Sequence, residues 1–299
     1  MSDSRLGWQQ LSLLVPGAIA ERHSDALLAA GALAVTLSDA GDNPVLEPPP
    51  GETPLWEQVC LTGLFAGDCD RAQVWLHLAA ALLPGPVPAA RWSELGERPW
   101  NDLWREHFRP RHCGGRLWIC PSWCAPPEPA AVNLLLDPGL AFGSGDHPTT
   151  ALCLEWLAAE PPAGARVLDF GCGSGILAIA ACLLGAAQAV AVDIDPQALT
   201  ATRANAQRNG IAPEQLMATE PEALDAGTYA VVLANILANP LIELAPRIAA
   251  LTAPGGRLCL SGILESQCAA VRDAYAPWFD FAPPAIRESW ARLTGSKTR

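Results

Sequence analysis

The most informative segment of the sequence is VLDFGCGSGIL, residues 167–177. An apolar strand-like run ends at Asp169, a glycine-rich loop of the form G-x-G-x-G follows, and an apolar helix is expected from Gly175. Glycines allow the loop to turn sharply and let a ligand come close to its backbone. The N–H groups of the loop and of the helix start attract negative or polar groups of a ligand. The segment therefore predicts a nucleotide site at the end of a buried strand.

The composition of this loop distinguishes two classes of cofactor. A dinucleotide-binding loop has the form G-x-G-x-x-G, and its third glycine would fall at 176, where this chain has Ile176. Asp169 would add negative charge beside a pyrophosphate, whereas a carboxylate suits the sulfonium and ammonium groups of S-adenosylmethionine. The loop favours S-adenosylmethionine over NAD, and hence a methyltransferase over an NAD-dependent oxidoreductase.

A second acidic position follows the next predicted strand. Residues 190–196 are VAVDIDP, and Asp193 ends this strand 22 residues after Gly171. An acidic side chain there can accept hydrogen bonds from both ribose hydroxyls of a nucleotide. Asp195 is expected to cap the helix that opens with Pro196. Together with the glycine loop, Asp193 completes the adenosine half of the predicted site.

A third strand end carries Asn235, in the segment LANILANP of residues 233–240. Its amide can hydrogen-bond a cofactor or an incoming amine, although Asn235 could also serve the turn alone. Nucleic-acid N-methyltransferases resemble this arrangement but have Asn/Asp-Pro-Pro-aromatic, whose ring stacks a flipped base. Here Ile236 and Leu237 follow, and the missing ring disfavours a base-modifying enzyme. Asn239 is expected to cap a helix that starts at Pro240.

Upstream, residues 136–150 (LDPGLAFGSGDHPTT) place two glycine turns around Phe142, with a helix expected from about Pro148. A glycine-hinged loop before the nucleotide core could fold over a bound cofactor. Thr150, in the first helical turn, could offer its hydroxyl to the methionyl carboxylate or amine, or act only as a second cap. His147 could be a base, but a histidine at a helix start is more often structural.

From residue 166 onward, strands and helices are predicted to alternate. The strands are expected at 166–169, 189–193, 229–234 and 257–261, and the helices at 175–184, 196–209, 240–251 and 265–276. This alternation predicts an α/β fold, a doubly wound, mostly parallel sheet covered by helices on both faces.

The first third has its own pattern, in the order β-α-β-β-α-β. The strands are expected at 8–15, 32–37, 59–65 and after Pro88, and the helices at 19–30 and 70–83. This order predicts a small ferredoxin-like α+β domain over residues 1–98. A short amphipathic helix is expected from Pro99 to Phe108, within a connector of residues 99–112. The nucleotide-binding domain then spans residues 113–299.

Charge and composition exclude several chemistries. The chain has 31 acidic and 19 basic residues, and Lys297 is the single lysine. A phosphate-binding G-x-x-x-x-G-K-[ST] loop is therefore absent, and a Schiff-base lysine is improbable. Residues 1–98 hold five basic and twelve acidic side chains, so we expect a basic protein partner and no direct nucleic-acid binding.

The cysteines and the hydropathy pattern point to a reducing compartment. Ten cysteines occur without a C-x-x-C pair, and we expect no metal site. The longest apolar stretch, residues 176–192, contains Gly185 and Gln188 and is typical of a buried helix, a turn and a strand. With no signal peptide expected at the start, these features predict a cytoplasmic protein.

Beyond these motifs, the chain resembles the bacterial ribosomal protein L11 methyltransferases over nearly its whole length. The likeness rests on residues 137–150, 169–175, 193–196 and 235–237, and extends to GGRLWICPSW at 114–123 and SGIL at 261–264. It implies an N-terminal substrate-recognition domain, a linker helix and a Rossmann-like class I methyltransferase domain.

The resemblance also implies trimethylation of lysine ε-amines and of the N-terminal α-amine of a large-subunit ribosomal protein. The implied cofactor contacts are Thr150, Gly171, Asp193 and Asn235, with Asn235 also orienting the amine, and we expect a monomer. Ser144 and Asp146 depart from the family pattern, in which threonine is common at both positions.

Overall fold

The computed structural model describes residues 7–41, 54–85, 87–95, 108–137, 145–225 and 227–298. By its internal contacts the chain divides into two compact units, Met1–Trp100 and Asn101–Arg299. The predicted helix of residues 99–108 lies outside the described residues except for Phe108, which is not helical. At the end of the predicted connector, Arg111 and His112 form strand β5 rather than a helix.

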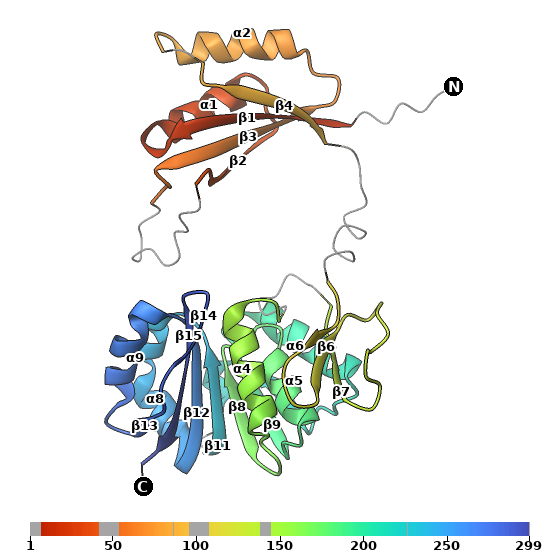
Figure 1. Cartoon of the computed structure of the whole chain (residues 1–299), viewed down its shortest axis with the longest axis vertical. Helices are drawn as coiled ribbons and strands as arrows, with labels where there is room; N and C mark the ends of the chain where they lie inside the picture. Colours follow the sequence, from red (N-terminus) through yellow and green to blue (C-terminus); the bar gives the residue numbers. More distant parts are fainter. Residues whose placement is uncertain are drawn as a thin grey trace. The chain divides into compact units, whose positions relative to one another are not determined.

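The N-terminal unit is a four-stranded antiparallel sheet with two helices against one face (Figure 1). Its elements are β1 (Trp8–Pro16), α1 (Ala20–Ala29), β2 (Ala34–Asp39), β3 (Gln58–Ala66), α2 (Arg71–Leu82) and β4 (Ala90–Leu95). The strand order β2-β3-β1-β4 confirms the predicted ferredoxin-like domain. Alternate residues of β1, Leu11, Leu13 and Val15, point into a core with Leu27 of α1 and Leu78 of α2.

The C-terminal unit is built on an eight-stranded sheet in the order β10-β9-β8-β11-β12-β15-β13, with β14 also paired to β15. The strands are β8 (Arg166–Phe170), β9 (Gln188–Val192), β10 (Leu216–Thr219), β11 (Tyr229–Asn235), β12 (Thr252–Leu264), β13 (Phe279–Phe281), β14 (Ala285–Arg287) and β15 (Trp290–Lys297). Pairing is parallel from β10 to β12 and antiparallel from β12 to β15 and β13. The predicted α/β class with a mostly parallel, doubly wound sheet is confirmed.

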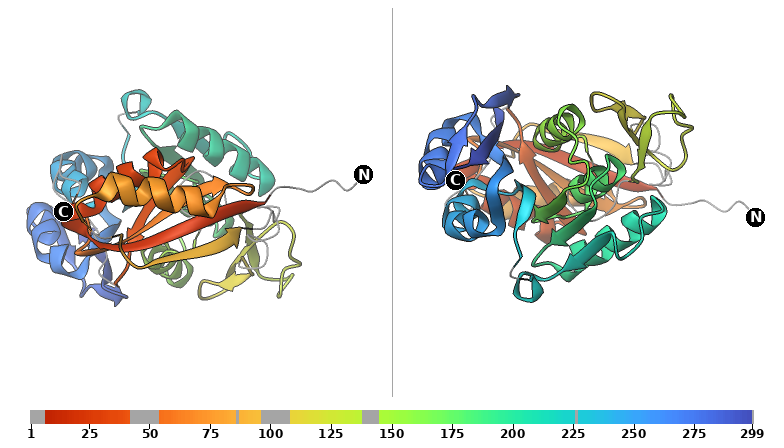
Figure 2. Two further views of the ribbon diagram at one scale, coloured as in Figure 1. Left: turned by 90° about the horizontal axis from the view of Figure 1, so that it is seen from above. Right: turned by 90° about the horizontal axis from the view of Figure 1, so that it is seen from below.

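Helices cover this sheet on both faces, and the strands supply two separate cores. The helices are α4 (Pro148–Ala159), α5 (Ile176–Leu183) and α6 (Pro196–Arg208) on one face, and α7 (Ala238–Glu243), α8 (Ala245–Leu251) and α9 (Cys268–Tyr275) on the other (Figure 2, right). Successive residues of β8 divide between the faces: Val167 joins the first core and Leu168 the second. Strands buried on both faces are characteristic of parallel sheets, which explains their nearly unbroken apolar sequences.

Several predicted details are wrong. The helix expected at 240–251 is two helices that meet at Leu244, because Pro246 in the first turn of α8 cannot donate the hydrogen bond that would continue α7. Asn239 lies inside α7, whose N-cap is Leu237. The sequence also gave no indication of the small sheet formed by β5 (Arg111–His112), β6 (Leu117–Cys120) and β7 (Val132–Leu135), which packs next to α5.

Candidate functional site

The glycine loop between β8 and α5 lies at the carboxyl edge of the sheet and has no space for a side chain at Gly171 or Gly175. Gly171 has φ +77°, and a Cβ added to it would lie 2.3 Å from Cγ2 of Ile236. Gly175 has φ +78° and faces Thr202, whose hydroxyl donates to the carbonyl of Gly173 at 3.0 Å. Only glycine tolerates both this backbone conformation and this proximity. The loop is therefore packed tightly against Ile236 and Thr202 at the point where β8 ends.

Asp193, which follows β9, is fixed by the loop beside it. Its Oδ2 accepts from the N–H of Gly173 at 2.9 Å, and its Oδ1 accepts from the N–H of Asp195 at 3.0 Å. Each carboxylate oxygen keeps a further lone pair, and the side chain is half-buried, so it can still accept from ribose hydroxyls. Asp195 caps α6 as predicted, accepting from the N–H of Gln197 at 2.8 Å. The next residue after Asp193, Ile194, is 84% exposed.

Thr150 and Asn235 come from different elements and meet at the same edge. Asn235 Nδ2 donates to the Thr150 hydroxyl at 3.2 Å, and Thr150 is completely buried in the first turn of α4. The other amide atom, Asn235 Oδ1, is buried and has no hydrogen-bond partner among the described residues. An unpaired buried acceptor costs free energy, roughly 1–3 kcal/mol. The structure therefore shows a fixed acceptor that a donor from a ligand would satisfy.

The backbone around Ile236 holds Asn235 in place. Ile236 lies between two glycines: its side chain contacts Gly171, and a Cβ on Gly262 would lie 2.4 Å from the carbonyl oxygen of Ile236. Gly262 also has a positive φ, +83°. Ser261 anchors this region because its hydroxyl donates to the carbonyl of Ala291 at 2.8 Å. We call residues 235–237 the β11 ledge; nothing in the local sequence showed that Gly262 would support it.

His147 takes the structural role. It is the N-cap of α4, where Nδ1 accepts from the N–H of Thr149 at 3.4 Å and lies 2.8 Å from its hydroxyl. Its ring packs edge-on against Trp290, with centroids 4.7 Å apart. Burial lowers the pKa of His147, and the nearby Glu288 carboxylate opposes this only in part. A ring engaged in this way is poorly placed to accept a proton from a substrate.

Asp169 is the most strongly perturbed acid of the site. It is 1% exposed; one oxygen accepts from the N–H of Ala178 in α5 at 3.0 Å, and the other, Oδ1, has no partner among the described residues. Burial raises its pKa to about 7, with a further upward contribution from Asp193, while the Ala178 N–H opposes the shift. Asp169 thus binds the first turn of α5 through one carboxylate oxygen, and its other oxygen can still accept from a polar or cationic group.

The predicted glycine-hinged loop falls partly outside the description, since residues 138–144, including Ser144, are not described. Both of its described ends are anchored. Asp137 accepts from the N–H and the hydroxyl of Ser122 at 2.7 and 2.9 Å. At the other end, Arg111 donates to the carbonyl of Gly145 at 2.7 Å and lies 3.5 Å from the carboxylate of Asp146. The charge that distinguishes Asp146 from the family pattern therefore has a partner on β5.

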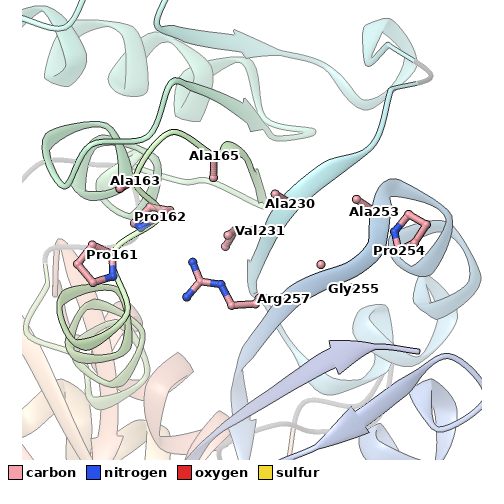
Figure 3. Close-up of a pocket in the computed structure, with 11 residues that line it drawn as sticks. Pro161, Pro162, Ala163, Ala165, Ala230, Val231, Ala253, Pro254, Gly255 and Arg257 are labelled. Carbon is pink, nitrogen blue, oxygen red and sulfur yellow. The ribbon is translucent and has the colours of Figure 1, made fainter. Parts of the chain in front are cut away.

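A cavity of about 300 Å³ lies at the opposite, amino-terminal edge of the sheet (Figure 3). It is lined by proline, alanine and glycine residues near the starts of β8, β11 and β12, and by Arg257. Arg257 is already paired, with Glu160 Oε2 at 3.1 Å and with the Glu160 carbonyl at 3.0 Å. This cavity contains none of the predicted site residues, and it lacks the converging polar groups that fix a ligand.

The described part of the chain offers neither a metal site nor a membrane span. There, no group of three or more His, Cys, Asp and Glu side chains could hold a metal ion. None of the helices in the same ranges is long and apolar enough to cross a membrane.

Comparison with known proteins decides the family. The family model described as ribosomal protein L11 methyltransferase (PrmA) matches residues 7–298. The chain belongs to this family. Ribosomal protein L11 methyltransferases of Cellvibrio japonicus and Ectopseudomonas mendocina are 51% and 54% identical to it, over 98% and 97% of this chain and 99% of each relative.

A solved structure agrees with this family. The crystal structure of ribosomal protein L11 methylase from Lactobacillus delbrueckii subsp. bulgaricus shares 34% identity, with a TM-score of 0.57, over 64% of this chain and all of that chain. Membership confirms the predicted enzyme class, a methyltransferase that uses S-adenosylmethionine. The four residues predicted to bind this cofactor all lie along the carboxyl edge of β8, β9 and β11 or at the start of α4. The half-buried carboxylate of Asp193 and the Asn235 Oδ1 acceptor are polar groups that suit such a ligand.

Proposed function

We propose that this enzyme methylates lysine ε-amines and the N-terminal α-amine of ribosomal protein L11 to the trimethylated state. The observation that carries the proposal is Asn235 Oδ1, a buried, fixed acceptor at the end of β11. An amine has N–H groups to donate to it, and the ledge lacks the aromatic ring that would stack a nucleobase. The family name supports the same substrate.

In this proposal, S-adenosylmethionine lies across the carboxyl edge of the sheet. The Asp193 carboxylate accepts from the ribose hydroxyls, and the exposed Ile194 side chain covers one face of the adenine ring. Gly171 allows the ligand to approach the backbone. Thr150 and Asn235 hold the methionyl end, so the reacting centre lies beside β11.

When bound, the cofactor would supply a methyl group on a sulfonium sulfur: the amine nitrogen would bond to the methyl carbon, and the carbon–sulfur electron pair would leave with sulfur. The chain's part is to position a neutral amine at about 3–3.5 Å. A lysine at its ordinary pKa of ~10.4 is ~3.4 units above neutral pH, and deprotonating it costs roughly 4.6 kcal/mol. An α-amine, with a pKa of about 7.7–8, costs much less.

No dedicated base is required in this scheme. Burial of the amine against the ledge lowers its pKa and makes up part of the cost. In the first two transfers, Asn235 Oδ1 accepts from an N–H of the neutral amine and directs its lone pair, after the ammonium group has lost a proton to water. The neutral dimethylamine that enters the third transfer has no N–H, so burial against the ledge alone positions it. His147 is assigned a structural part in this scheme, because its Nδ1 caps α4 and its ring packs against Trp290.

We further propose that residues 1–98 recognise the ribosomal protein. This segment carries five basic and twelve acidic residues, a net charge of −7 that favours encounter with a basic partner. Each unit has its own core, so recognition and transfer can reside in separate parts of the chain. We expect a cytoplasmic monomer that does not bind nucleic acid directly.

A label-transfer experiment tests the function. The enzyme is incubated with methyl-labelled S-adenosylmethionine and, in parallel, purified ribosomal protein L11, the remaining ribosomal proteins and ribosomal RNA. We expect label on L11 amines, mapped by tandem mass spectrometry to lysine side chains and the N-terminus. Label on RNA, or on no component, contradicts the proposal; the second result would favour an assembly factor that kept only the fold.

A further inference from the structure

The β11 ledge ends in a feature that the proposed reaction does not yet use. Leu237 follows Asn235 by two residues, and half of its surface is exposed. It is the N-cap of α7, with extended backbone angles (φ −60°, ψ 156°), while the first buried positions of α7, Ala238 and Leu241, enter the core. Leu237 is thus held outside the core by the start of the helix that follows it.

The position of Leu237 is fixed by the same contacts that fix Asn235. Ile236, between them, is held by Gly171 on its side chain and by Gly262 on its carbonyl. An isolated exposed leucine on a surface needs no explanation. This one lies on a segment held by two glycines, two residues from a buried acceptor that has no partner among the residues the structure describes. That combination points to a ligand with an apolar part and an N–H donor.

In the proposed function, the cofactor runs from Asp193 to Asn235, which puts this feature on the substrate side. Asp193 and Ile194, after β9, form the adenosine end of the site, whereas Asn235 and Leu237, after β11, form the end where the methyl group is transferred. β8 and the glycine loop lie between them. An exposed apolar side chain at the transfer end is therefore available to the amine-bearing substrate rather than to the nucleotide.

We propose that Leu237 is a specificity-determining residue that packs against the methylene stem of a substrate lysine. This inference rests on the proposed amine methylation. A lysine ε-amine is carried on four methylene groups, which lose contact with water when they lie on Leu237. Contact with Leu237 also excludes water from around the amine, and this desolvation lowers the pKa of the amine. An α-amine has no such stem, so Leu237 favours ε-amines over the α-amine.

The test compares the two kinds of amine within one substrate. Full-length wild-type enzyme and Leu237→Ala, Leu237→Met and Met217→Ala variants are incubated with ribosomal protein L11, and initial rates at lysines and at the N-terminus are measured by mass spectrometry. Met217 is the matched control because it is also exposed and apolar (44%), but lies on β10. Thermal melting and S-adenosylmethionine titration verify that each variant folds and binds cofactor.

We expect the ratio of kcat/KM for ε-amines to that for the α-amine to fall about tenfold in Leu237→Ala, mainly through KM. Leu237→Met should restore the ratio, and Met217→Ala should leave it as in wild type. An unchanged ratio in Leu237→Ala, with wild-type enzyme active at both amines, overturns this inference alone. Wild-type enzyme that labels no lysine overturns the proposed function and this inference with it.

Discussion

Substitution of Gly171 by alanine tests the cradle that the loop and the ledge form together. The new Cβ would lie 2.3 Å from Cγ2 of Ile236, whereas carbon atoms in contact are about 3.5–4.0 Å apart. The loop and the ledge must therefore separate by at least about 1.2 Å. Ile236 has little room to retreat, since its carbonyl faces Gly262. The positive φ adds about 1–2 kcal/mol of strain.

A displacement of about 1 Å at a transfer site costs on the order of 100-fold in rate. We therefore expect Gly171→Ala to lower kcat/KM for protein methylation by about that factor and to weaken S-adenosylmethionine binding in calorimetric titration. Gly164→Ala is the matched control: its φ is +69°, but no atom lies within 4 Å of the added Cβ. That variant should lose only the stability that the positive φ costs, measured by thermal melting, and keep wild-type kinetics.

A double variant identifies the contact responsible. Ile236→Ala removes the methyl group that the new Cβ would meet, so Gly171→Ala/Ile236→Ala should recover part of the lost cofactor affinity. The reasoning is refuted if Gly171→Ala and Gly164→Ala have the same kinetics. It is equally refuted if the double variant binds cofactor more weakly than the product of the two single effects predicts.

Three further predictions concern the rest of the site. Asn235→Ala should lower kcat by about 10- to 100-fold and weaken cofactor binding, measured by initial rates and titration; unchanged values would show that Asn235 only serves a turn. Asp169 has a folded-state pKa of about 7, above its ordinary 3.8, so the free energy of unfolding of the wild type should fall as pH rises from about 4 to 7. Urea unfolding at pH 5 and pH 8 should show this loss in the wild type and not in Asp169→Asn. The same change with pH in both proteins would contradict the raised pKa. Removal of residues 1–98 should preserve S-adenosylmethionine binding and abolish L11 methylation, and retained L11 methylation would show that recognition resides elsewhere.

Features encoded in short segments could be predicted from the sequence. The glycine loop, Asp193 at the end of β9 and the Asp195 cap each depend on a short local pattern of a few consecutive residues. The β-α alternation gave the sheet, and the order in the first third gave the ferredoxin-like domain. In each case the local pattern and the tertiary fold favour the same structure.

Features that depend on distant partners could not be predicted. Strand β5 has two residues, and its pairing with β6 gives no periodic signal. The contact between Gly262 and Ile236 joins residues 26 positions apart, and the burial of Asp169 depends on helix α5 above it. Among the described residues, Asn235 Oδ1 is buried without a hydrogen-bond partner, and this too follows from packing. The sequence shows only that an amide is present.

The most direct test of the central claim is a crystal structure of the full chain with S-adenosylhomocysteine. The account predicts the ribose hydroxyls on the Asp193 carboxylate, the adenine beside Ile194, and the homocysteine end beside Thr150 and Asn235. A ligand bound instead in the cavity near Arg257, at the amino-terminal edge of the sheet, would contradict it.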